Sequence, residues 1–304
     1  GFQWVDVVFF AGNDVWRNDG RQEVVFRAAS ENGGLYLAVD RLEILPWAPV
    51  ARADFKSTAL EEHDPHGISG GDSGGGSDWL WLADGTASIA LPFKADDDSH
   101  LVLRVASDTG AMLTISIGGR EAGAFQVPRG HRWVEGGVYV PKSLWSAGPL
   151  QRVFFEASVG GTSGRVALDW IEDRPVEFQS EFNIGEVDAA QYAGRGFGFS
   201  GQTSDATFQF MDSDTVALDL PLRTEGNAGR LVFRVASVRG ARVYTSVNGE
   251  PAGSFDLRGG GEFVDAAVLV PRSGWSNGPA QHLELKVARP DESSPLLLDR
   301  VFLT

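Results

Sequence analysis

Tryptophan and phenylalanine pairs are the side chains of this 304-residue sequence most suited to contact a ligand. Trp79 and Trp81 lie two residues apart, as do Phe208 and Phe210, so in a strand both members of each pair share one face. Such rings can contact a ligand, or they can fill a core. Filling a core is the more common use, so the pattern alone leaves both uses open.

Histidine and carboxylate groups give a weaker signal for catalysis or metal binding. The segment 61–66 contains three carboxylates and two imidazoles, which could bind one divalent cation. Its counterpart, 188–196, has no histidine, which favours a solvated loop. The five histidines form no pattern typical of a nucleophilic triad. The sequence leaves open the alternative that a pair of carboxylates catalyses cleavage of a glycosidic bond. The absence of cysteine excludes disulfides and thiolate chemistry.

The elements that must position these side chains occur more than once. Residues 133–174 repeat the pattern of residues 4–45, and residues 263–304 repeat it again, with periods of 129 and 130 residues. Periods of this length are typical of whole domains in a row. The repeated markers are an aromatic residue (Trp4, Trp133, Phe263), a tryptophan (Trp16, Trp145, Trp275) and an aspartate (Asp40, Asp169, Asp299).

The repeats divide the chain into modules. We expect residues 1–47 to be the C-terminal half of a module, and residues 48–175 and 176–304 to be complete modules. Because an isolated half lacks partners for its strands, missing residues or another chain would complete it.

The local pattern is that of β-structure. Polar and apolar residues alternate along 114–117 and 244–247, which predicts half-buried strands. Gly118-Gly119 and Asn248-Gly249 follow these strands and suit two-residue hairpin turns, which need positive φ angles. No segment has a capped helical pattern of ten or more residues. The fold class predicted is all-β, with tandem antiparallel β-sandwich domains of the jelly-roll kind.

The order of motifs resembles carbohydrate-binding module family 6 and related galactose-binding-like β-sandwich modules. It is carried by LVLRVAS (101–107), the glycine hairpin, a spaced Gly123 and the closing LDWI (168–171), and it recurs in the third module and partly in the first. The resemblance implies a sugar site at one end of the sandwich, between an aromatic residue of an early strand and one of a later turn. The positions that match are Trp81, Trp133, Phe210 and Phe263.

The sequence departs from the family pattern at two places. The turn of that family commonly carries a second tryptophan three residues on, where this chain has Val7, Gly136 and Ala266. An asparagine that bonds the sugar is replaced by Ala38, Ala167 and Leu297.

The resemblance also implies a structural calcium ion. Its ligands would be acidic residues of the first and last strands, which are oxygen donors of the kind calcium prefers. The candidates are Asp54, Asp169, Glu181 and Asp299.

Composition limits the partners. A net charge of −15 and a pI near 4.7 disfavour nucleic acid and anionic membranes. The sequence contains no run of 18 apolar residues, so it gives no signal for insertion into a membrane. We expect an extracellular or cell-surface protein.

Two functions follow from these observations. The first is a non-catalytic array of modules that binds a polysaccharide or glycan, as part of a larger polysaccharide-active or surface protein. Duplication favours binding, because tandem binders gain avidity. The alternative is a structural subunit of a filament, stalk or surface layer, assembled by self-association through residues 1–45.

Overall fold

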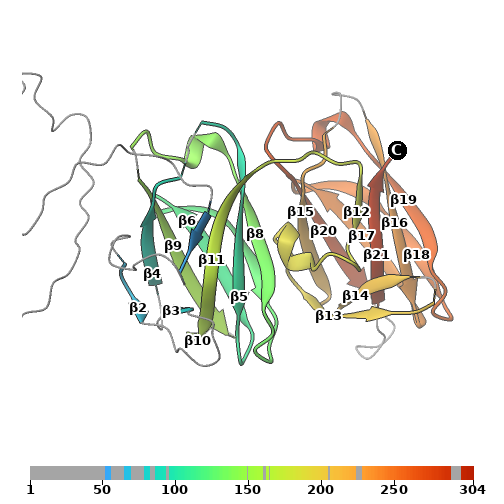
Figure 1. Ribbon diagram of the computed structural model, residues 1–304. Coiled ribbons are helices and arrows are strands. Elements are labelled where there is room, and N and C mark those ends of the chain that lie inside the picture. The colour runs from blue at the N-terminus through green and yellow to red at the C-terminus, as the bar shows by residue number, and fades with distance from the viewer. Residues whose placement is uncertain are drawn as a thin grey trace, which may run out of the picture.

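The computed structural model describes residues 52–55, 65–69, 79–82, 86–93, 96–148, 150–159, 162–163, 165–204, 206–223, 228–288 and 296–304. The predicted half-module 1–47, its self-association and the acidic residues of 61–64 lie outside these residues and stay predictions. The described residues form two antiparallel β-sandwiches, which confirms the predicted fold class. In Figure 1 the sandwiches lie side by side.

In the first sandwich, one sheet has the order β2-β3-β11-β5-β8, with β1 also on β11, and the other has the order β10-β9-β6-β7, with β4 on β9. We name them the β11 sheet and the β9 sheet. The elements are β1 (Arg52–Asp54), β2 (Ile68–Ser69), β3 (Leu80–Leu82), β4 (Thr86–Leu91), β5 (Ser99–Ala106), β6 (Ala111–Ile117), β7 (Arg120–Val127), β8 (Val134–Val140), the 3₁₀ helix η3 (Lys142–Leu144), β9 (Gln151–Val159), β10 (Thr162–Ser163) and β11 (Val166–Pro175).

The second sandwich repeats this order. Its β21 sheet runs β13-β14-β21-β16-β19, with β12 on β21, and its β20 sheet runs β15-β20-β17-β18. The elements are β12 (Glu181–Asn183), η4 (Ala189–Tyr192), β13 (Phe197–Gln202), β14 (Thr207–Met211), β15 (Thr215–Leu220), β16 (Gly229–Ser237), β17 (Arg239–Val247), β18 (Glu250–Gly259), β19 (Val264–Val270), η5 (Arg272–Gly274), β20 (Gln281–Ala288) and β21 (Leu296–Leu303).

The hairpins between β6 and β7 and between β17 and β18 have the predicted turns. Gly118 and Gly119 have φ angles of 57° and 82°, and Asn248 and Gly249 have 51° and 84°. Positive φ at both central residues matches the right-handed twist of the flanking strands. The turn chemistry read from the sequence therefore fixes the register of both hairpins.

Each sandwich has its own apolar core between its sheets. The repeated tryptophans contribute to these cores: Trp145 is buried beside Phe93, and Trp275 packs against the second core. These two copies of the repeated tryptophan therefore have a packing role. The polar Gln151 and Gln281 are buried next to them and hold the turns after η3 and η5 through bonds to the main chain of Ser146 and Ser276.

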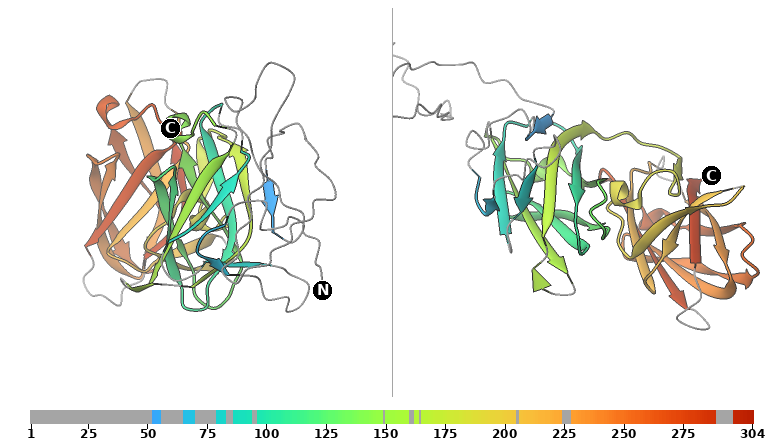
Figure 2. Two further views of the ribbon diagram at one scale, coloured as in Figure 1. Left: turned by 90° about the vertical axis from the view of Figure 1, so that its left-hand side faces the viewer. Right: turned by 60° about the horizontal axis from the view of Figure 1, so that its bottom comes forward.

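The segment around η4 joins the two sandwiches. It belongs to the second sandwich by sequence, yet Ala190 and Ala193 are part of the first core. The Gln126 N–H of β7 donates to the Gly194 carbonyl (2.9 Å), and the His100 ring bonds the Gln191 carbonyl (2.9 Å). In Figure 1 the short yellow helical turn η4 lies on the side of the second sandwich that faces β8. The two further views in Figure 2 also show the two sandwiches next to each other.

The helical turns of the described residues are short 3₁₀ elements, and none could span a lipid bilayer.

Candidate functional site

The outer face of the β11 sheet carries a compact aromatic cluster. Trp81, Ala106 and Ala167 are buried there, with Trp79 and Trp133 packed against them. The neighbouring Leu80 and Leu168 belong instead to the core between the sheets, because successive residues of a strand point to opposite faces. The pair Trp79 and Trp81 therefore lies outside the main core.

The Trp79 ring meets the Trp81 and Trp133 rings edge to face, and one histidine lies beside all three. The centroid of Trp79 lies 6.4 Å from that of Trp81 and 5.9 Å from that of Trp133. The His131 ring is 6.1–6.3 Å from all three indoles. Its position is set by the turn before β8, where the His131 N–H donates to the Ser107 carbonyl and its φ is 54°. Trp79 and Trp133 are half-buried and His131 is exposed, so the cluster presents a mixed aromatic and polar surface.

Two arginines complete this surface. The guanidinium of Arg165 lies 3.8 Å above the Trp81 ring, and that of Arg104 lies 5.6 Å from the Trp133 ring, both within cation–π range. Arg104 also binds the carboxylate of Asp169 (2.9 Å), whose side chain is 4% exposed. Hydrogen-bond donors thus surround an apolar patch, which suits a hydroxyl-bearing ring.

The second sandwich repeats the cluster with phenylalanines. Phe208, Ala236 and Leu297 are buried, with Phe210 and Phe263 packed against them. The registers confirm the equivalence, since Trp81 pairs with Ala167, and Phe210, 129 residues after Trp81, pairs with Leu297, 130 residues after Ala167. Arg234 takes the place of Arg104, lying 3.0 Å from Asp299 and 6.0 Å from the Phe263 ring.

Each pair of residues predicted to form the sugar site lies within one of these clusters. Trp81 and Trp133 belong to the first, and Phe210 and Phe263 to the second. Trp81 is only 9% exposed and its face is covered by Arg165. The more accessible tryptophans are Trp79 and Trp133.

Sequence reasoning missed other members of the clusters. It gave no role to His131 or Arg165, because neither residue recurs in the other repeats. It also missed Phe199 of β13, which is 65% exposed and lies 4.2 Å from the Phe210 ring. The spacing of two residues from Phe197 would have placed Phe199 on the core face instead, because Phe197 belongs to the second core. Only the register shift between Phe197 and Ser200, which the sequence does not signal, brings Phe199 beside Phe210.

The two departures from the family pattern have different structural settings. Gly136 faces the core, where an added Cβ would lie 2.0 Å from the Phe125 ring, so this place cannot present a second tryptophan. Ala167 lies under Trp81, opposite Ala106, on the outer face. A small residue at 167 leaves room for the indole above it.

The predicted calcium ligands are paired with arginines. Asp54 binds Arg52 (3.3 Å) and Asp169 binds Arg104, while Glu181 binds Arg300 (2.9 Å). Calcium requires six to eight oxygen ligands. Within the part of the chain that the structure describes, no three histidine, aspartate or glutamate side chains gather in a metal-binding arrangement. These carboxylates therefore do not fit a calcium site built from the described residues.

The first-strand acids are also not equivalent to each other. Asp54 pairs with Trp170, whereas Glu181 pairs with Phe302. Since Trp170 corresponds to residue 300, Asp54 corresponds to Asn183, and Glu181 corresponds to Arg52. The two acidic residues therefore lie two positions apart along their equivalent strands.

No protein-family model matches the chain, and no curated protein matches it. Among solved structures, the tandem of two CBM22 modules of Xyn10C from Paenibacillus barcinonensis is similar, with 13% identity over 83% of this chain and 96% of that chain and a TM-score of 0.32. The C-terminal CBM6 of LamC, a marine laminarinase from Zobellia galactanivorans, has 17% identity over 40% of this chain and 97% of that chain, with a TM-score of 0.31. A CBM36 module solved with calcium and xylotriose has 16% identity over 41% and 100%, with a TM-score of 0.30. All three of these solved structures are of carbohydrate-binding modules.

Proposed function

We propose that this chain is a non-catalytic array of carbohydrate-binding modules and that the tryptophan cluster of the first sandwich is its main glycan site. The observation that carries this proposal is the group of Trp79, Trp81 and Trp133 on the outer face of the β11 sheet, with His131 and Arg165 at their edges. Large aromatic side chains are usually buried inside a core, so a cluster of three on an outer sheet face favours a role in ligand binding.

The chemistry of the cluster suits a sugar. The C–H groups of a pyranose form an apolar patch that stacks on an indole, while its hydroxyls need hydrogen-bond donors and acceptors at the rim. Trp79 and Trp133 supply the accessible rings, and His131 and Arg165 supply polar groups. Because Arg165 lies over Trp81, a sugar reaching that ring must displace the guanidinium.

The phenylalanine cluster of the second sandwich would act as a weaker copy. Phenylalanine offers a smaller ring than tryptophan, and Phe199 is its most exposed member. Two sites held in one chain can engage one polysaccharide together and so raise avidity. We expect this array to work outside the cell, attached to a polysaccharide-active or surface protein.

The test is binding to a glycan array and to insoluble polysaccharides. We expect the double variant Trp79→Ala, Trp133→Ala to lose affinity at least about tenfold for the glycans that the native chain binds, which corresponds to about 1.4 kcal/mol. Tyr244→Ala is the matched control, since Tyr244 is 47% exposed on the β20 sheet, away from the cluster.

Circular dichroism would check that each variant remains folded. Unchanged binding by the double variant, or no glycan binding by the native chain, would contradict the proposal.

A further inference from the structure

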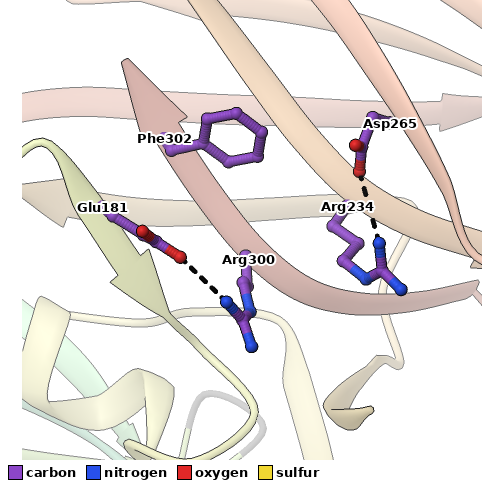
Figure 3. Close-up of a pocket in the computed structure, with 5 residues that line it drawn as sticks. All are labelled: Glu181, Arg234, Asp265, Arg300 and Phe302. Atoms are coloured by element: carbon purple, nitrogen blue, oxygen red, sulfur yellow. Dashed lines mark hydrogen bonds and ion pairs between the residues drawn. The ribbon is translucent and has the colours of Figure 1, made fainter. Parts of the chain in front are cut away.

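A hollow of about 370 Å³ lies on the outer face of the β21 sheet. Its lining comes from β12, β16, β19 and β21, and Figure 3 shows the side chains around one space, with the Phe302 ring on one side and two guanidinium groups on another. The volume is in the range of small-molecule sites. The lining residues are Glu181, Arg234, Asp265, Arg300 and Phe302.

The charges of this hollow, which we name the β21 pocket, are arranged in two levels. Asp299 lies beneath, 2% exposed, with Arg234 at 3.0 Å and Arg300 at 3.6 Å. Burial raises the pKa of Asp299, and the two arginines oppose that rise. Above it, Glu181 binds Arg300 at 2.9 Å and Asp265 lies 3.7 Å from Arg234.

This arrangement decides what kind of ligand the β21 pocket can accept. Three carboxylates face two guanidinium groups, so an anionic ligand would add to an excess of negative charge. A hydroxyl group carries no charge and can both donate and accept. Neighbouring hydroxyls of a neutral sugar could therefore accept from Arg234 or Arg300 and donate to Glu181 or Asp265.

Two further features favour a sugar ring. Phe302 is half-buried and forms an apolar wall on which the C–H face of a ring can lie. The pairs formed by Glu181 and Asp265 are solvent-exposed, and exposed ion pairs contribute little stability, so they can reorganise around a ligand at small cost.

Among the described residues of the first sandwich, the equivalent surface is filled by side chains. Trp170 replaces Arg300 there and is 4% exposed, and the Arg52 guanidinium lies 4.3 Å from its ring. Glu172 replaces Phe302 and binds Arg174 at 2.8 Å. The equivalent surface is thus filled by a tryptophan and its arginine, and the β21 pocket is a feature of the second sandwich.

We propose that the β21 pocket binds one neutral sugar ring of a glycan chain, as a second subsite beside the phenylalanine cluster. Arg234 connects the two, since its guanidinium lines the pocket and lies 6.0 Å from Phe263. This inference rests on the proposed function, because it takes the chain to be a glycan binder. It adds the position of a subsite and a preference for neutral over acidic sugars.

The test uses the full ¹⁵N-labelled chain in NMR titrations. The neutral probes are xylotriose, cellotriose and laminaritriose, and the acidic probe is trigalacturonic acid. Arginine Nε–H signals report on the β21 pocket, and tryptophan indole N–H signals report on the tryptophan cluster. Because loss of Arg300 would leave Asp299 and Glu181 uncompensated, the main variant is Phe302→Ala, which keeps every ion pair. Glu172→Ala, at the equivalent position of the first sandwich, is the control.

We expect a neutral trisaccharide to shift the Arg234 and Arg300 signals in a saturable way. Phe302→Ala should weaken this binding at least about tenfold, whereas Glu172→Ala should leave it unchanged. Trigalacturonic acid should not shift the Arg234 and Arg300 signals. Shifts confined to the tryptophan signals would overturn the pocket and leave the proposed function standing. Shifts confined to the arginine signals would support the pocket and count against the tryptophan cluster. Arginine shifts caused only by trigalacturonic acid would overturn the neutral preference, and no shift with any probe would overturn both proposals.

Discussion

His100 and Asp173 are partly buried ionisable residues on neighbouring strands of the first sandwich, β5 and β11. The His100 ring stacks on Tyr139, 4.3 Å away, and burial lowers its pKa to about 4. A bond to the Gln191 carbonyl opposes this fall, and the charge of Arg174 adds to it. Burial raises the pKa of Asp173 to about 6. Both groups are therefore shifted toward their neutral forms.

These shifts act on stability in opposite senses. Between pH values of about 6.5 and 4, the unfolded chain binds a proton at His100 that the folded chain does not, so the free energy of unfolding falls as the pH falls. Between about 3.8 and 6, the folded chain keeps a proton on Asp173 that the unfolded chain loses, so the free energy of unfolding falls as the pH rises. The two effects oppose each other over most of the same window.

Removing one group should reveal the effect of the other. We expect His100→Phe to gain stability relative to the native chain as the pH falls from 7 to 4, by up to about 3 kcal/mol. Asp173→Asn should lose stability relative to the native chain over the same fall. Urea unfolding at several pH values measures both. Parallel pH profiles for the native chain and His100→Phe would contradict the assignment.

At the scale of elements, the packing of β8 against β7 depends on the absence of a side chain at 136. The Phe125 ring of β7 fills the space above Gly136, and an added Cβ there would lie 2.0 Å from its Cε2 atom. Phe125 is fully buried in the first core, so it has little room to move. Interiors of this density resist even one added methyl group.

We therefore expect Gly136→Ala to lower the free energy of unfolding by about 1–3 kcal/mol, because the new methyl group must displace the Phe125 ring. Gly148→Ala is the control, since the nearest atom to its added Cβ would be 3.6 Å away. That change should stay within about 0.5 kcal/mol. Equal effects of the two substitutions in urea unfolding would show that the contact with Phe125 is relieved without cost.

At the scale of the whole molecule, the two sandwiches share buried surface. Ala190 and Ala193 come from the second sandwich but lie in the core of the first. The bonds from Gln126 and His100 to main-chain carbonyls of 191–194 fix the same segment. The two proposed glycan sites should consequently keep a fixed position relative to each other, which would favour their binding to one sugar chain.

Breaking this shared surface should uncouple the unfolding of the two sandwiches. We expect the native chain to show one main transition in differential scanning calorimetry and Ala190→Arg to show two, because the charge cannot be buried unpaired. Ala147→Arg, at an exposed turn, should leave the single transition in place. Two transitions already present in the native chain would contradict strong coupling.

The sequence was informative wherever a property depends on near neighbours in the chain. The alternation along 114–117 predicted half-buried strands, and Gly118-Gly119 predicted a hairpin, because strand faces and turn angles are local properties. The repeat itself placed Arg104 and Arg234, or Asp169 and Asp299, at equivalent positions. It also pointed to Trp81 and Trp133, which the structure brings into one cluster.

Tertiary structure alone decided which groups meet across the sheets. Whether Trp79 and Trp81 face the main core or the outer surface depends on which side of β3 the second sheet packs, and alternation is the same in both cases. The covering of Trp81 by Arg165, the entry of Ala190 into the first core and the pocket around Phe302 all join residues distant in sequence. Such contacts are set by strand order and register, which a local pattern of residue types does not reveal.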